Sequence, residues 1–250
     1  MSTPRDVLIA YSQQQASPEQ VWRALTEHSG YYVPAAFAVK QLGATRMQSG
    51  MVFAPEVPRA DHDLFLFTNP IAAACAEGAP IGTFASEFSG VRIFQAIDGS
   101  FTGIRVNPHS PKNEGWYVSQ EAIALAKLWA QVVHLEQALA NASDVLPYAE
   151  VAAHPGFMVL INSDHLPITM NLNQPAGSYA VAFTSPDRFQ SFVSKQPVEQ
   201  HANLKSATLD GATLCQQLAQ FEVSGVVLFG HGQTILRRDE FDTVVAARQA

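Results

Sequence analysis

The sequence predicts an α/β fold with mixed β-sheets, arranged as two similar tandem domains. First, 47% of the 250 residues are hydrophobic and only 15% are charged, which supplies enough apolar side chains for packed cores and argues against disorder. Second, short continuous apolar runs alternate with segments of helical periodicity. Third, several blocks of sequence recur in the same order in the two halves of the chain, as expected of an internal duplication.

The recurring blocks are separated by slightly different distances, which is the effect of loops of different length. They pair residues 27–33 with 153–159, 64–70 with 180–186, 89–97 with 210–218, 102–106 with 224–228, and 119–123 with 238–242. The duplication predicts an N-terminal extension over residues 1–17, a first domain over 18–143 and a second domain over 144–250. The polar segment 141–144 marks the boundary. The alternative is that two unrelated α/β stretches share generic strand and turn patterns.

The first copy opens with a helix whose start is visible in the sequence. Ser17 is the predicted N-cap, Pro18 the first helical residue and Gln20 the capping-box partner. Residues 31–39 follow as a predicted strand because they are rich in aromatic and β-branched side chains. Pro34 limits part of that strand to a sheet edge.

Strands and helices then alternate along the chain. Residues 51–53 predict a short strand, and residues 64–67 predict a strand that is buried on both faces. Residues 68–70 (Thr-Asn-Pro) end that strand and open a helix. A further helix over 90–97 precedes a strand over 103–106. The second copy repeats this order with a helix from Pro186, a helix over 211–220 and a strand over 225–229.

The copies diverge in the loops 107–115 and 230–233, each of which leads into a short strand and then a helix. The first of these helices begins after Ser119 and extends to about residue 140. Its apolar stripe comprises Leu125, Leu128, Val132, Leu135 and Leu139. The stripe predicts packing on its own sheet and against the second copy. The alternative is a homodimer through the 119–140 helix, because this spacing suits helix–helix packing.

Charge and hydropathy exclude several classes of partner and location. The net charge of −7 argues against nucleic-acid partners and against an anionic membrane surface. No apolar run approaches the ~18 residues that a membrane helix needs, and the N-terminus lacks the pattern of a secretory signal. The expected location is therefore the cytoplasm. Cys75 and Cys215 lie in helix-like apolar segments and are expected to be buried, reduced thiols.

The predicted elements resemble the SseB family, whose name refers to enhanced serine sensitivity in bacteria. The resemblance depends on residues 22–26 (Trp-Arg-Ala-Leu-Thr) running into 31–34, on the passage 67–70 matched by 183–187, and on 103–111 followed by the helix after Ser119. It covers about residues 18–130 and, more weakly, 148–246. It implies a compact α/β domain with a mixed sheet, present twice, that serves as a binding or regulatory module. It supplies no catalytic residues.

The sequence offers no recognised catalytic or metal-binding motif. The eight histidines are scattered, and no His-Glu-x-x-His or Cys-x-x-Cys spacing occurs. The 61–63 segment (Asp-His-Asp) is interpreted as a solvated loop. The 230–232 segment (Gly-His-Gly) lacks the third glycine of a dinucleotide fingerprint and is interpreted as a turn. We therefore expect no catalytic residues, no metal and no cofactor, and a protein that is not an enzyme.

The candidate binding residues lie near the end of the 103–106 strand. Arg105 is a charge within an apolar strand, so it must face solvent or be paired. It could form an anion or partner site with Asn107 and His109 on the following loop. Aromatic side chains could form an exposed recognition patch, with core packing as the alternative. These are Tyr31, Tyr32, Trp116 and Tyr117.

Two histidines occupy equivalent positions in the two copies. His28 and His154 each lie next to a helix end, close to a glycine. We expect a structural role there, in which a partial positive charge complements the helix dipole. A ligand contact is the alternative.

These observations favour a non-catalytic binding or regulatory module that acts through protein–protein interaction. The resemblance implies a bacterial cell and a secretion- or stress-associated context. One alternative is a small-molecule sensor that uses the cleft between the two copies, since ligand sites are common at domain interfaces. Another is a hydrolase or transferase whose nucleophile the sequence does not reveal.

Overall fold

The computed structural model describes residues 3–34, 41–42, 54–55, 63–68, 81–82, 84–107, 115–143, 145–197 and 204–248. The chain divides into two compact units, Met1–Val133 (unit 1) and His134–Ala250 (unit 2). Each combines helices with β-sheet, so the predicted α/β class is confirmed. The division falls inside helix α6 (Gln120–Asn141), upstream of the polar segment 141–144 expected to mark it, because one continuous helix contributes buried residues to both units.

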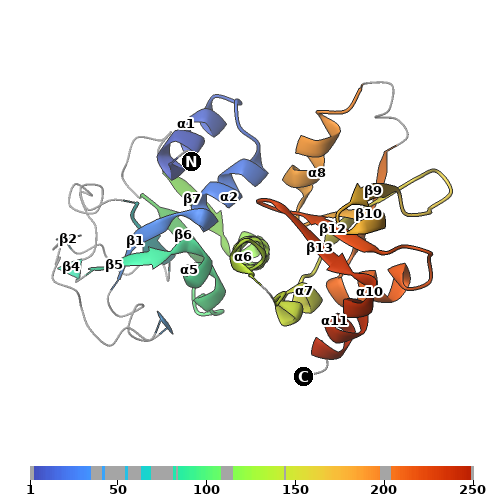
Figure 1. Cartoon of the computed structure of the whole chain (residues 1–250). Helices are drawn as coiled ribbons and strands as arrows, with labels where there is room; N and C mark the ends of the chain where they lie inside the picture. The colour runs from blue at the N-terminus through green and yellow to red at the C-terminus, as the bar shows by residue number, and fades with distance from the viewer. Residues whose placement is uncertain are drawn as a thin grey trace. The chain divides into compact units, whose positions relative to one another are not determined.

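Unit 1 places its helices and strands in the order shown in Figure 1. The helices are α1 (Pro4–Ser12), α2 (Pro18–Glu27), α5 (Gly90–Ala96) and the first part of α6. The strands are β1 (Ser29–Pro34), β2 (Ala54–Pro55), β3 (Asp63–Leu66), β4 (Ile81–Gly82), β5 (Phe84–Ser89), β6 (Gly103–Val106) and β7 (Trp116–Ser119). The predicted strand at 51–53, the helix start after residue 68, Cys75 and His109 lie outside the described residues.

The main strands of unit 1 form a two-stranded sheet, β5-β1, and a three-stranded sheet, β3-β6-β7, and a bridge from β1 to the residue after β3 places them in the order β5-β1-β3-β6-β7. β1 is antiparallel to β5, β3 is parallel to β6, and β6 is antiparallel to β7. The backbones of Tyr32 and Phe67 exchange two hydrogen bonds of 2.9 and 3.0 Å, which join β1 to the end of β3. A separate short pair is formed by β2 and β4. The parallel β3–β6 pair places the carboxyl ends of both strands at one edge.

The N-terminal helices follow their capping signals. Ser17 and Gln20 form the predicted capping box of α2. Residues 1–17, expected to be an extension, contain a second capped helix, α1, in which Thr3 and Asp6 form another capping box. Leu8 of α1 is buried in the core of unit 1. Pro4 and Leu8 are the buried residues of α1, so this helix belongs to the packed part of unit 1.

The buried face of α6 differs from the predicted stripe. In unit 1 it consists of Ile123, Ala126, Trp129, Ala130 and Val133, together with Val132. Leu125 and Leu128 remain 40% and 38% exposed, whereas Leu135 and Leu139 are buried in unit 2. The buried face therefore includes two alanines, Ala126 and Ala130, that the predicted stripe omits. Of the five residues in the predicted stripe, Leu125 and Leu128 are the two that a second copy of the chain could contact.

Unit 2 contains the remaining elements (Figure 1). Its helices are the end of α6, α7 (Tyr148–Ala153), α8 (Pro186–Val193), α10 (Gly211–Leu218), the 3-10 turn η1 (Arg238–Glu240) and α11 (Phe241–Ala247). Its strands are β8 (Phe157–Ile161), β9 (Thr169–Asn173), β10 (Ala176–Phe183), β11 (Lys205–Leu209), β12 (Gly225–Phe229) and β13 (Gln233–Arg237).

The sheet of unit 2 has the order β11-β8-β10-β12-β13, with β9 also paired to β10. β10 and β12 are parallel, and the other pairs are antiparallel. This order and these directions match β5-β1-β3-β6-β7 in unit 1. One face of the sheet packs on α7, α10 and α11, and the other packs on α8 (Figure 1).

A glycine lies where two helices touch in each unit. A Cβ on Gly90 would lie 2.2 Å from the Leu25 carbonyl oxygen, and a Cβ on Gly211 would lie 1.7 Å from the Val151 carbonyl oxygen. The backbone amide of Gly90 donates to the carbonyl oxygen of His28 at 2.8 Å, and that of Gly211 donates to the carbonyl oxygen of His154 at 3.0 Å. Only glycine allows this close approach of the helix backbones.

Within the described ranges, no helix combines the length and the apolar character needed to cross a bilayer.

Candidate functional site

Arg105 and Tyr117 lie side by side on one face of the unit 1 sheet. The strand register places Phe65, Arg105 and Tyr117 in one cross-strand row. The Arg105 guanidinium carbon lies 5.1 Å from the centroid of the Tyr117 ring, which is a cation–π contact. Tyr117 is 50% exposed. The two residues therefore present an aromatic and a cationic group together at the surface.

A buried carboxylate holds Arg105 in this position. Arg105 Nε donates to Asp63 Oδ2 at 2.6 Å, and Thr102 Oγ1 donates to Asp63 Oδ1 at 3.0 Å. The Asp63 side chain is almost fully buried, whereas that of Arg105 is 44% exposed. Gly103 leaves the space in which the Tyr117 ring lies, because a Cβ there would come within 2.6 Å of that ring. Arg105 is thus both paired and solvent-facing.

The other predicted aromatic residues do not join Tyr117. Trp116 is half-buried and packs against Trp22 and Tyr11, with ring centroids 4.8 and 6.1 Å away. Tyr31 is completely buried, and its hydroxyl donates to the Leu25 carbonyl at 2.8 Å. Burial raises the pKa of Tyr31.

The expectation of one exposed aromatic patch is therefore corrected. Neighbouring residues of a strand point to opposite faces of the sheet, so Trp116 and Tyr117 cannot share a surface. Tyr31 lies in the core, and Tyr32 is half-buried and bonded through its backbone to Phe67. Of the four aromatic residues, Tyr117 is the one that the structure leaves available to a partner.

Asn107 is a structural residue at the end of β6. It is buried and has a positive φ of 47°, a conformation that asparagine tolerates better than most residues. Its Oδ1 accepts from the Thr68 amide at 2.9 Å, and its Nδ2 donates to the Thr68 hydroxyl at 3.0 Å. Asn107 therefore joins the carboxyl ends of β3 and β6 and is not presented to a partner.

The corresponding row in unit 2 is apolar. Val181, Val227 and Ile235 occupy the positions of Phe65, Arg105 and Tyr117 in the strand register. Four phenylalanines on β10, α8 and β12 pack together on this face, with ring centroids 5.1–5.9 Å apart. They are Phe183, Phe189, Phe192 and Phe229.

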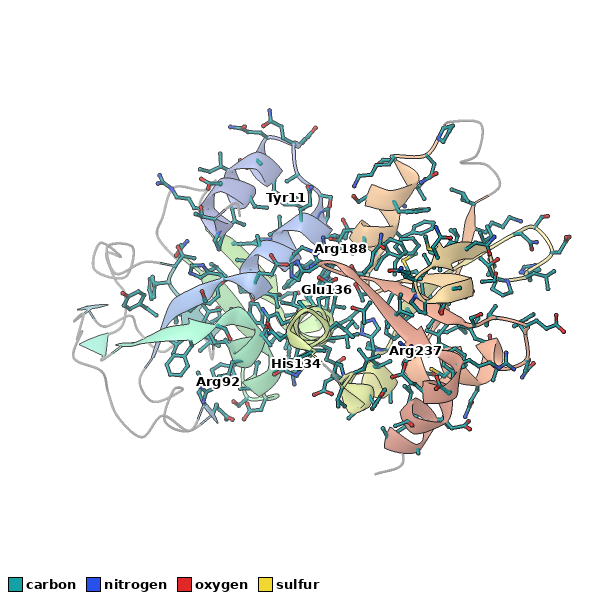
Figure 2. All side chains as sticks on the ribbon, in the orientation of Figure 1. Tyr11, Arg92, His134, Glu136, Arg188 and Arg237 are labelled. Atoms are coloured by element: carbon teal, nitrogen blue, oxygen red, sulfur yellow. The ribbon has the colours of Figure 1, made fainter. Side chains whose placement is uncertain are left out.

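The carboxyl ends of β10 and β12 carry a polar network that the sequence did not predict. Its centre is Glu136 of α6, whose side chain is fully buried. Thr184 Oγ1 donates to Glu136 Oε1 at 2.5 Å, and Arg188 Nη2 donates to Glu136 Oε2 at 2.9 Å. In Figure 2 the labelled side chains of Glu136 and Arg188 lie close together beside α6. A buried carboxylate needs such partners because its desolvation is costly.

His231 completes this network from the β12–β13 turn. Its Nδ1 lies 3.1 Å from Arg188 Nη2, and arginine can only donate, so Nδ1 accepts. Its Nε2 faces Glu136 Oε2 at 3.6 Å. We refer to Glu136, Thr184, Arg188 and His231 as the strand-end network. It fixes the orientation of the buried carboxylate.

A cavity of about 340 Å³ adjoins the strand-end network. Its walls are Glu136, Leu139 and Ala140 of α6 and residues 230–234 of the β12–β13 turn. Open α/β sheets bind ligands outside the carboxyl ends of their parallel strands, and this cavity lies at that edge of β10 and β12. The volume is at the lower end of the range for small-molecule sites, roughly 300–1,000 Å³.

His154, at the C-terminal end of α7, lies at the same edge of the sheet, beside Thr184. It ends that helix, and its Nε2 donates to the Thr184 carbonyl at 3.0 Å. Burial lowers the pKa of His154 to about 4, although the Thr184 carbonyl and Glu136 oppose this. Burial likewise lowers the pKa of His28, with the Thr68 backbone in opposition. The expected positive charge at these helix ends is therefore absent at neutral pH, because burial outweighs the dipole.

One signal in the sequence could have revealed Glu136. It lies four residues after Val132 and three before Leu139, so it shares a helix face with two members of the apolar stripe. A charge on an apolar face must be paired. Its partners, Thr184 and Arg188, lie far away in the sequence, and only the fold brings them together.

Two residues with nucleophilic groups are inaccessible. Cys215 is buried, as predicted, and burial raises the pKa of its thiol to about 12. The Thr184 hydroxyl is also buried and donates to Glu136. Neither group can reach a substrate in this arrangement.

Comparisons with known proteins give little further information. No protein-family model matches the chain, and no curated protein matches it with significant similarity. Among solved structures, Tic22 from Anabaena, a protein of protein transport, matches with 10% sequence identity and a TM-score of 0.23, over 82% of this chain and 88% of that chain. Similarity at this level carries no argument about this protein.

Proposed function

We propose that the protein is a non-catalytic binding module that acts by contact with a protein partner, through the face of unit 1 that carries Arg105 and Tyr117. The observation that carries this proposal is the half-exposed Tyr117 ring held beneath the Arg105 guanidinium. Tyrosine and arginine are enriched among the residues that dominate binding energy at protein interfaces. Because Asp63 and Gly103 hold the pair in place, a partner would meet an ordered surface.

We also propose that the chain arose by duplication of one SseB-type unit. In this proposal the protein acts in the cytoplasm of a bacterial cell. Support comes from the matching strand orders and from the close helix contacts at Gly90 and Gly211. In both units a histidine, half-buried His28 or buried His154, immediately precedes the strand that is second in this order, β1 or β8. In this view the first copy keeps the contact surface, whereas α8 covers the equivalent face of the second.

The experiment is site-specific photo-crosslinking in cells. A photoreactive amino acid replaces Tyr117 in the full chain, and the same amino acid replaces Leu166 as a control, because Leu166 is 48% exposed on unit 2. The expected result is one defined cross-linked protein from position 117 and none from position 166. The absence of a defined product from position 117, or the same product from both positions, would contradict the proposal.

A second measurement tests the two side chains directly. The captured protein is purified, and its affinity is measured for the wild type, Tyr117→Ala, Arg105→Ala and Leu166→Ala. Loss of a central interface aromatic or arginine costs about 2 kcal/mol or more, so both unit 1 variants are expected to bind at least roughly tenfold more weakly. Leu166→Ala should bind as the wild type does.

A further inference from the structure

We propose that the protein partner binds unit 1 as an extended segment that adds a strand to the outer edge of β7. This inference rests on the protein contact proposed above and names the form in which the partner binds. The backbone of Tyr117 exchanges two hydrogen bonds with the added strand, and the Tyr117 ring contacts one of its side chains.

The place of β7 in the sheet is the first argument. Among the described residues, β6 is the one strand that pairs with β7, so β7 ends the strand order of unit 1. A terminal strand can pair with another chain, and proteins commonly protect such edges with charged side chains. The other three strands that end the two orders, β5, β11 and β13, contain Glu87, Lys205 and Arg237, whereas β7 contains no charged residue.

The direction of the hydrogen bonds in β6 is the second argument. Successive residues of a strand direct their backbone N–H and C=O groups to opposite sides. The amide of Asn107, directly after β6, donates to the Leu66 carbonyl of β3 at 2.8 Å. The odd-numbered residues of β6 therefore bond toward β3, and the even-numbered residues bond toward β7.

This alternation decides which backbone groups of β7 face outward. Ile104 and Val106 are the even-numbered residues of β6, and they lie opposite Val118 and Trp116 in the strand register. Those two residues of β7 therefore bond to β6, and the N–H and C=O of Tyr117, between them, point away from it. No described residue hydrogen-bonds to either group of Tyr117. An added strand supplies both partners.

The Tyr117 side chain gives the added strand a specific contact. Its ring is 50% exposed and lies beside the Arg105 guanidinium. Directly opposed side chains of neighbouring strands lie about 4.5–5.5 Å apart at Cβ, and aromatic or β-branched residues pair best with an aromatic ring. The segment is therefore expected to carry such a residue opposite Tyr117. A second copy of the chain is a poorer occupant, because two chains of net charge −7 repel each other.

The test measures amide hydrogen exchange by NMR for the full chain, alone and in complex with the protein captured from position 117. The Tyr117 amide should exchange at least roughly tenfold more slowly in the complex, because its N–H becomes hydrogen-bonded. The control is the amide of Ile235, which holds the same register position in unit 2 and should keep its exchange rate.

The outcomes separate this inference from the protein contact itself. Equal exchange of the Tyr117 amide with and without the captured protein would overturn the added strand and leave the contact through the side chains standing. If position 117 captures no defined protein, both proposals fail. Identification of the captured protein as a second copy of this chain would also overturn the inference.

Two variants separate the backbone of Tyr117 from its ring. Tyr117→Ala and Tyr117→Pro both remove the ring, but the proline also removes the N–H, and proline is tolerated on edge strands where that group faces outward. Tyr117→Pro should bind the captured protein about tenfold more weakly than Tyr117→Ala does. Equal affinities would overturn the inference. If Tyr117→Pro does not fold, the hydrogen exchange of the wild type decides.

Discussion

Units 1 and 2 arrange their strands in the same order, but one face of the sheet is covered by a helix in unit 2 and carries solvent-exposed side chains in unit 1. In unit 2, Val227 and Ile235 lie on a face that α8 covers with phenylalanines. In unit 1, the same register positions hold Arg105 and Tyr117, which face solvent. The comparison teaches that the strand order does not determine whether a face is core or surface. Side chains on the same scaffold make that difference.

The two units also differ in the side chains at the carboxyl ends of their parallel strands. In unit 1, Asn107 joins the two strand ends with neutral hydrogen bonds to Thr68. In unit 2, the amide and the hydroxyl of Thr184 join the strand ends by donating to the Phe229 carbonyl, at 3.0 and 3.1 Å. Glu136 and Arg188 add an ion pair there, beside a cavity. One unit therefore carries its charged groups on the sheet face, and the other carries them at the strand ends.

The largest expected effect tests what the units share. Gly211→Ala should prevent unit 2 from folding, at a cost above about 4 kcal/mol, because the new Cβ would lie 1.7 Å from a backbone oxygen. Gly90→Ala should do the same to unit 1. Gly99→Ala, in open space, is the control. Circular dichroism and thermal unfolding measure all three, and a wild-type melting curve for Gly211→Ala would refute the close contact.

The second test removes the centre of the strand-end network. Glu136→Ala leaves Arg188 and Thr184 without their carboxylate, and breaking a buried ion pair costs about 3–5 kcal/mol. Gln137→Ala, at the exposed neighbouring position of α6, should change stability little. Denaturant unfolding of the two variants gives the difference. Equal stabilities would show that the network does not support the fold.

The third test concerns pH. The pKa of His154 is about 4 in the folded protein and 6.5 in the unfolded chain, so the unfolded chain binds a proton first as the pH falls. The free energy of unfolding should therefore decrease between pH 6.5 and pH 4, by about 3 kcal/mol in total. Denaturant unfolding at several pH values measures this decrease.

His28 should contribute to the same decrease with the same sign, since its pKa is also lowered. The control is His165→Gln, which changes an exposed histidine and should leave the pH dependence intact. His154→Gln should reduce it. If the histidine resonances of His154 titrate near pH 6.5 in the folded protein, the burial argument fails.

The smallest expected effect separates stability from binding. Arg105→Val places the residue of unit 2 into unit 1, and it should lower the free energy of unfolding by about 1–3 kcal/mol, because the almost fully buried Asp63 carboxylate keeps its bond from Thr102 but loses its cation. The same variant should lose the protein contact proposed for unit 1. An unchanged free energy of unfolding would indicate that the Arg105–Asp63 pair does not support the fold.

Local signals predicted much of the fold. The capping box at Ser17 and Gln20 and the strands β6 and β12 agree with the sequence analysis, because each depends on neighbouring residues. The stripe predicted on α6 is confirmed at Val132, Leu135 and Leu139, which are buried, and is wrong at Leu125 and Leu128, which are exposed. What a helix packs against decides which of its apolar residues are buried, and the sequence pattern does not show it. The strand-end network was missed altogether, because Glu136, Arg188 and His231 meet only in the folded chain.

Helix α6 has a consequence for any attempt to study one unit without the other. The division between the units falls between Val133 and His134, inside an unbroken helix. Cutting there would leave carbonyls at the end of one fragment and amides at the start of the other without their i to i+4 partners. The second fragment would begin with a piece of helix too short to persist in water, and Glu136 lies in that piece. Severing the chain at its natural division would therefore dismantle the site nearest to the cut.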